Sequence, residues 1–71
     1  MVDPLPLVAS NLRRLRQEHG LTQDALAQEA SMDAAEIRRI ESGQRDPGVR
    51  VITRLARGLG VPPAELFDGV E

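Results

Sequence analysis

The chain has 71 residues, which is enough for one small domain. It contains no Cys, which excludes disulfides and thiolate zinc sites, so apolar side chains alone must form the core. Eleven acidic residues against nine arginines give a formal net charge of −2, which argues against binding nucleic acid through bulk charge, although a small basic face can exist within a negative total.

The sequence contains no signal for a membrane. No apolar run approaches the roughly 18 residues of a membrane span. The N-terminal segment MVDPLPLV lacks the basic start and the long apolar stretch of a signal peptide. We therefore expect a soluble cytoplasmic protein with no membrane partner, folded as a single domain over residues 1–71.

Two helices are predicted in the first part of the chain. Apolar residues recur at helical spacing before Gly20, which predicts a helix over about residues 6–19. Thr22 follows as an N-cap, and the preceding and following leucines are spaced as a hydrophobic staple. The second helix is therefore expected over about residues 23–30.

A third helix is predicted directly after a short turn. Asp33 is suited to the N-cap, and Glu36 three residues later predicts a capping box. This helix is expected over about residues 34–42, before Gly43. The polar loop GQRDPG that follows cannot continue a helix, because it holds Pro47 between two glycines.

The last part of the chain completes an all-helical pattern. An apolar stripe that ends at Gly60 predicts a fourth helix over about residues 49–59. Pro63 suits the first position of a last short helix over about residues 63–68. No segment alternates with the period of two that marks a strand. The expected fold class is therefore all-α with five short helices.

The third predicted helix has two different faces. At 100° per residue, Ile37 and Ile40 fall on one side, while Ala35, Arg38 and Arg39 fall on the other. Small residues at a helix start permit close approach to another surface, and guanidinium groups bind phosphates or the O6 and N7 atoms of guanine. Two interpretations remain for the arginine pair: a face that enters a DNA groove, or solvated side chains on an ordinary surface.

The order of the elements distinguishes these interpretations. Two short helices joined by a tight turn form the unit whose second member lies in the major groove of DNA. The sequence also resembles the Xre or lambda-repressor-like helix-turn-helix regulators over roughly residues 8–67. The resemblance rests on the fragments GLTQDALAQEA, MDAAEIRRIESG, QRDPG and VITRLARGLGVPPAELF. Two positions depart from the family pattern: Ser31 replaces the usual Gly of the turn, and Gly48 replaces the usual Ser before the fourth helix.

The proposed DNA contacts follow from this placement. The residues expected to reach base edges lie on the outer face of the third helix: Ala34, Ala35, Arg38 and Arg39. The residues expected to contact phosphates lie at the start of the second helix and around the loop after the third: Thr22, Gln23, Ser42, Gln44, Arg45 and Arg50. The alanines cannot hydrogen-bond a base, so specificity would rest mainly on the two arginines.

One ion pair is expected inside the domain. Arg16 falls on the inward stripe of the first helix, and Glu41 falls on the inward side of the third. The two charges would compensate each other as a pair between helices, which is also what the family resemblance implies. The alternative is two independently solvated side chains.

The sequence predicts no enzyme. It has no Cys nucleophile, no Ser beside an obvious His and Asp, and no glycine-rich phosphate loop. No cofactor is expected, and His19 as the only histidine makes a metal site improbable. We expect a sequence-specific double-stranded DNA-binding transcriptional regulator of the repressor or controller type. The alternative is a protein-interaction or antitoxin-like subunit with the same fold.

A second copy of the chain is the other expected partner. One module buries too little surface for tight selective binding, and relatives on palindromic sites place two recognition helices about 34 Å apart. We therefore expect a homodimer on a palindromic operator. Its contact surface is expected at the C-terminal end, where the apolar residues are Leu66, Phe67 and Val70. The alternative is that these residues close the core.

Overall fold

The computed structural model describes residues 2–71. It contains four α-helices and one short 3-10 helix, and no β-strand occurs in these residues. The helices are α1 (Leu5–Glu18), α2 (Gln23–Ala30), α3 (Ala34–Glu41) and α4 (Val49–Leu59), followed by the 3-10 helix η1 (Pro63–Phe67). The all-α class is confirmed. The expectation of five α-helices is wrong, because the last element is a 3-10 helix of only five residues. It begins at Pro63, and Gly69 follows it with a φ of +84°.

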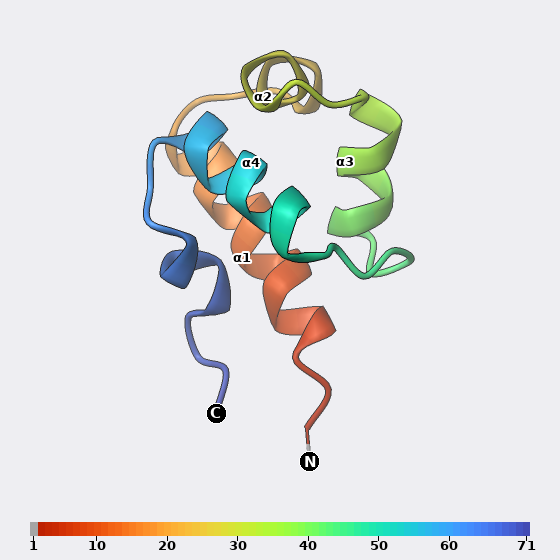
Figure 1. The fold of residues 1–71 in the computed structure, drawn as a ribbon, viewed down its shortest axis with the longest axis vertical. Helices are drawn as coiled ribbons and strands as arrows, with labels where there is room; N and C mark the ends of the chain where they lie inside the picture. The colour runs from red at the N-terminus through yellow and green to blue at the C-terminus, as the bar shows by residue number, and fades with distance from the viewer. Residues whose placement is uncertain (1) are drawn as a thin grey trace.

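The elements surround one core (Figure 1). In this view α2 crosses one end of the molecule, α3 lies along one side, and the C-terminal segment lies along the opposite side. Both chain ends lie at the end opposite α2. The core side chains come from every element: Val8, Leu12, Leu15, Leu26, Ala27, Ala30, Ile37, Ile40, Ile52, Leu55, Ala56, Leu59 and Leu66.

The helix ends follow from local chemistry. The carboxylate of Asp3 accepts the amide hydrogen of Leu5 at 3.0 Å and so begins α1 one residue before the expected position. After α1, Gly20 adopts a φ of +67°, a left-handed conformation that glycine reaches without a steric penalty. The same conformation ends α4 at Gly60, with a φ of +73°.

A close approach between α2 and α4 depends on another glycine. A Cβ atom added to Gly58 would lie 3.1 Å from the backbone nitrogen of Ala30 and 3.3 Å from its Cα. Ala30 is itself buried and small. The absence of a side chain at Gly58 therefore sets how closely the two helices pack.

The C-terminal segment is attached to α1 by a buried amide. The side-chain nitrogen of Asn11 donates to the carbonyl of Leu66 at 3.0 Å and to the carbonyl of Asp68 at 2.9 Å. Leu66 is fully buried, so this contact holds a core residue in place. Among residues 2–71, no helix has the length and apolar composition needed to cross a bilayer.

Candidate nucleic-acid interface

The α2 and α3 helices are joined by a turn of three residues. The hydroxyl oxygen of Thr22 accepts the amide hydrogen of Ala25 at 3.0 Å, which satisfies one free donor at the start of α2. At the other end of α2, Ser31 has a φ of +55°, in the left-handed region that favours glycine. The amide of Met32 then donates to the carbonyl of Ala27 at 2.8 Å and closes the turn.

The start of α3 differs from the sequence-based expectation. Asp33 occupies the N-cap position with extended backbone angles, but its side chain makes no capping hydrogen bond. Its carbonyl accepts the amides of Glu36 at 3.0 Å and of Ile37 at 3.3 Å. The Glu36 carboxylate lies 3.7 Å from the Arg45 guanidinium. The predicted capping box is therefore absent, because Glu36 turns toward the loop.

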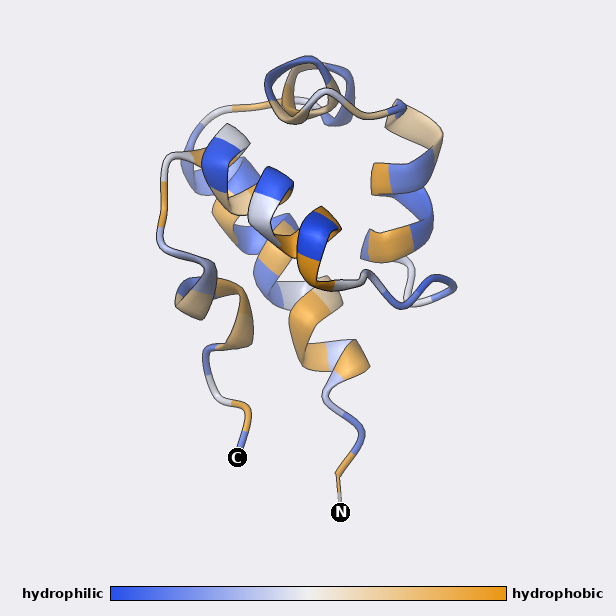
Figure 2. Cartoon of the chain, viewed as in Figure 1, coloured by the Kyte–Doolittle hydropathy of each residue, from blue (hydrophilic) through white to orange (hydrophobic). Residues whose placement is uncertain are grey.

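The two faces of α3 are separated as predicted. Ile37 and Ile40 are fully buried, whereas Arg38 and Arg39 are exposed. Colouring by hydropathy shows apolar and polar bands succeeding each other along this helix (Figure 2). Within residues 2–71, neither arginine has a carboxylate within ion-pair distance. Both guanidinium groups are therefore available to an external ligand.

The inward side of α3 carries a buried carboxylate. Glu41, whose side chain is only 1% exposed, accepts hydrogen bonds from Arg16 Nε at 2.6 Å and from the Arg16 terminal nitrogen at 3.0 Å. Arg16 also donates to the carbonyl of Leu21 at 2.9 Å, so each of its three guanidinium nitrogens donates a hydrogen bond. This is the ion pair expected from the sequence, and it joins α1 to the end of α3.

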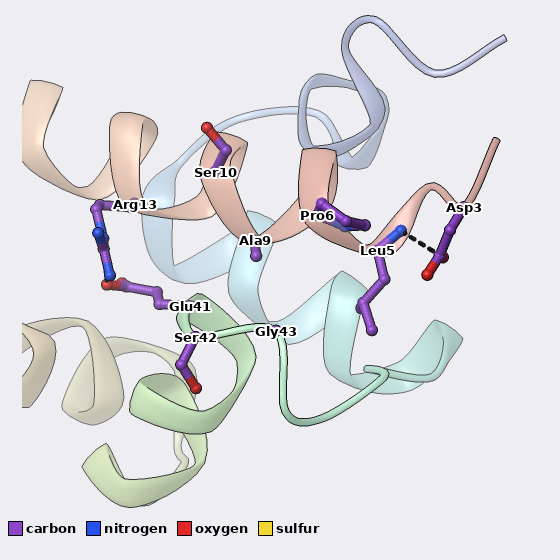
Figure 3. A pocket seen from close by; sticks show the side chains of 9 residues that line it. All are labelled: Asp3, Leu5, Pro6, Ala9, Ser10, Arg13, Glu41, Ser42 and Gly43. Carbon is purple, nitrogen blue, oxygen red and sulfur yellow. Dashed lines mark hydrogen bonds and ion pairs between the residues drawn. The ribbon is translucent and has the colours of Figure 1, made fainter.

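The Glu41 carboxylate receives two further donors. Gln23 Nε2 lies 3.2 Å from Glu41 Oε1. Arg13 Nε lies 3.5 Å from the same oxygen, and the side chains of Arg13 and Glu41 are both drawn in Figure 3. Burial acts to raise the pKa of Glu41, but the hydrogen bonds from Arg16 and Gln23 and the charge of Arg16 outweigh burial and hold the pKa below its ordinary value. The hydrogen bond to Glu41 in turn raises the pKa of Arg16. Both groups are charged over the physiological range.

The structure arranges the remaining candidate residues around α3. Ala34 and Ala35 are half-buried at its start, and Ser42 is exposed at its end, with its hydroxyl donating to the carbonyl of Arg39 at 3.0 Å. The other candidates, which lie in the following loop and at the start of α4, are all exposed: Gln44, Arg45 and Arg50.

The predicted dimer residues do not form one surface. Leu66 is fully buried, so its assignment to a dimer contact is wrong: its side chain packs with the other apolar residues of the core. Phe67 is 43% exposed, and Val70 lies half-buried beside Leu7 at the surface. Only Phe67 and Val70 remain accessible to a partner.

Arg13 is a charged residue of this region to which the sequence assigned no role. The structure places it at the edge of the Glu41 cluster, with its side chain 56% exposed. The signal was present in the sequence, because Arg13 precedes Arg16 by three residues and therefore shares a helical face with it.

Two short helices joined at a tight turn, with unpaired arginines on the outer face of the second, define a helix-turn-helix protein. The sequence model of a family described as a helix-turn-helix domain matches residues 8–67. The chain belongs to this helix-turn-helix family, which confirms the resemblance found from its motifs.

Named relatives agree with this membership. The HTH-type transcriptional regulator y4dJ of Sinorhizobium fredii is 38% identical over 65 residues, which cover 92% of this chain and 84% of that protein. Control protein C.MunI from Mycoplasma sp. is 30% identical over 63 residues, covering 87% of this chain and 85% of its own length. The crystal structure of the restriction-modification controller protein C.AhdI from Aeromonas hydrophila matches with a TM-score of 0.85 at 35% identity, covering 87% of this chain and 94% of that chain.

Proposed function

We propose that the protein is a sequence-specific double-stranded DNA-binding transcriptional regulator that inserts α3 into the major groove. The observation that carries this proposal is the pair of exposed, unpaired guanidiniums of Arg38 and Arg39 opposite the buried Ile37 and Ile40. The relatives are named as transcriptional regulators and controller proteins rather than as enzymes, which supports the same class. No cofactor is part of the proposal.

The two arginines have different proposed roles. Arg39 lies at 200° from Ile37 on the helical wheel and therefore points straight outward, whereas Arg38, at 100°, leans toward one wall of the groove. Arg39 contacts a base edge, and guanine is the base that a guanidinium fork matches best. Arg38 divides its contacts between a base and a phosphate. The half-buried Ala34 and Ala35 allow the start of α3 to approach the bases closely.

The test is selection from a random duplex library with the wild-type protein and with Arg39→Ala. Arg39→Ala is expected to lose about 1–3 kcal/mol of binding free energy on the selected site and to relax the preference at one base position per half-site. The control is Arg57→Ala, which removes an equally exposed arginine from α4 and is expected to leave the consensus unchanged.

One outcome would overturn the proposal that α3 recognises a DNA sequence. If Arg39→Ala selects the same consensus as the wild type while its circular dichroism spectrum stays native, α3 does not read sequence. A protein-interaction or antitoxin-like subunit then becomes the better description, and the overall negative charge of the chain would fit that description.

The proposed assembly is a homodimer on a palindromic operator. Val70 and the neighbouring Leu7 supply one accessible apolar contact, and Phe67 supplies a second one from a separate hollow beside Pro47. Two copies would place their α3 helices about 34 Å apart, one turn of the duplex. Sedimentation velocity on the free protein and on a full operator tests this proposal. A monomer both free and on DNA would contradict it.

Among regulators, we infer the restriction-modification controller type. Two of the relatives are named as controllers, and this chain covers 85% and 94% of their lengths, so the likeness extends over nearly the whole of each. A selected operator that lies upstream of an adjacent methyltransferase or endonuclease gene would support this inference, and an operator with no such neighbour would contradict it.

A further inference from the structure

Arg13 on α1 carries a positive charge that the fold compensates only in part. The cluster around Glu41 contains two guanidiniums, Arg13 and Arg16, and a single carboxylate, which leaves one positive charge uncompensated. Arg16 binds the carboxylate through two nitrogens at 2.6 and 3.0 Å and is nearly buried, so it neutralises Glu41. Arg13 approaches only to 3.5 Å and is 56% exposed, so the surplus charge lies at the surface.

The orientation of Arg13 is nevertheless defined. Its Nε faces the oxygen of Glu41, and within residues 2–71 its two terminal nitrogens donate no hydrogen bond. An exposed arginine normally loses side-chain entropy when it binds a ligand, and a contact that already orients the side chain reduces that loss. Arg13 therefore presents a free, pre-oriented pair of donors of the kind that binds phosphate in a bidentate manner.

Arg13 lies close to residues that are proposed to contact DNA. Gln23 shares the same oxygen of Glu41, and Ser42 follows Glu41 directly in the chain. Arg13 and Ser42 line one open hollow between α1 and the end of α3, together with Ser10 (Figure 3). Asp3, the other acidic residue of this hollow, lies beyond Ser10 on the N-terminal side and accepts the amide of Leu5.

We propose that Arg13 binds a phosphate of the operator DNA and so extends the interface from the helix-turn-helix unit onto α1. This inference rests on the proposed function, because it places the phosphate in the hollow that Arg13 shares with Ser42, the residue that directly follows the inserted helix. The ligand is a backbone phosphodiester, so the contact carries no sequence information.

The experiment compares Arg13→Ala, Arg13→Lys and Arg14→Ala by fluorescence anisotropy of labelled duplex over a range of salt concentrations. Arg14 is the matched control, because it is an adjacent exposed arginine whose partners are two exposed carboxylates, Glu18 at 2.7 Å and Asp68 at 3.9 Å. Arg13→Ala is expected to weaken binding about tenfold on selected and unrelated duplexes alike, and to lower the slope of log K against log salt by about one unit. Arg13→Lys restores the slope because it restores the charge, and Arg14→Ala keeps both affinity and slope within about twofold of the wild type.

Failure of this inference is distinguishable from failure of the proposed function. If the wild type binds duplex DNA and depends on Arg39, but Arg13→Ala has the wild-type slope, then Arg13 does not contact phosphate. If the wild type binds no duplex, the proposed function fails and this inference fails with it. Melting curves for all three variants are expected to match the wild type, and a large loss of stability in Arg13→Ala would assign Arg13 to folding instead.

Discussion

Among substitutions that remove one arginine, a substitution of Arg16 is expected to destabilise the fold most. Arg16→Met keeps most of the aliphatic volume but deletes two hydrogen bonds to Glu41 and one to Leu21. The carboxylate, only 1% exposed, then keeps only Gln23 and the more distant Arg13 as partners. A buried charge that loses its partner lowers stability by about 3–5 kcal/mol, and the two remaining donors place the expectation near 3 kcal/mol.

This loss is large for so small a protein. At about 0.05–0.15 kcal/mol per residue, a chain of 71 residues has a free energy of unfolding of roughly 4–10 kcal/mol. The chain has no Trp and no Tyr, so unfolding is followed by far-ultraviolet circular dichroism in urea and on heating. The melting temperature is expected to fall by at least about 12 °C, at about 4–8 °C per kcal/mol. The control, Arg14→Met, is expected to change stability by less than about 0.5 kcal/mol because both partners of its ion pair are exposed.

Two further results refine this test. The double variant Arg16→Met, Glu41→Gln is expected to be more stable than Arg16→Met alone, because the uncompensated charge has been removed. The pKa of Glu41 is lowered in the fold, so its ionised form contributes stability that is complete above about pH 4.3 and is lost as the pH falls through the folded value. Glu41→Gln is expected to remove this part of the acid dependence. A loss below about 1 kcal/mol in Arg16→Met, with no gain in the double variant, would refute the reasoning.

Three other substitutions test separate features. Gly58→Ala is expected to lower the free energy of unfolding in urea by about 1 kcal/mol, because the new Cβ would lie 3.1 Å from the backbone of Ala30 and this contact outweighs the gain in helix propensity. A more stable variant would show that α2 shifts to make room for the methyl group. Ser31→Gly is expected to stabilise by about 0.5–1 kcal/mol, because glycine relieves the left-handed strain at a φ of +55°, and an unchanged melting temperature would contradict this. Arg45→Ala is expected to weaken binding to all duplexes alike and to lower the salt slope by about one unit; a change in the selected consensus would show that Arg45, held 3.7 Å from Glu36, reads bases.

The parts of the fold that depend on local sequence could be predicted. Thr22 caps α2 because its hydroxyl needs only a donor three residues away, and Gly20 and Gly60 end helices because few other residues adopt their φ values. The Arg16–Glu41 pair could also be predicted, because a charge on an inward helical stripe requires a partner of opposite sign.

The features that depend on distant contacts could not be predicted. The sequence left open whether Leu66 meets a partner or closes the core, because a five-residue 3-10 helix has too few positions to define an inward face. In the fold its side chain packs into the core, and the amide of Asn11, 55 residues earlier in the chain, binds its carbonyl. The prediction of a capping box at Asp33 was wrong because the Glu36 carboxylate lies beside Arg45 of the following loop instead. The base and phosphate contacts of α3 remain predictions, because they require the ligand.

The attachment of the C-terminal segment to α1 determines how the protein can be extended. Asn11 binds the carbonyl groups of Leu66 and Asp68 and so holds the C-terminal segment against α1, and both chain ends leave the molecule at the end opposite α2 (Figure 1). A reporter or a second module joined to either end therefore starts at a distance from the α2–α3 turn. Conversely, truncation before Leu66 would open the core from that same end, so the shortest chain that keeps the arginine face of α3 intact must retain this segment.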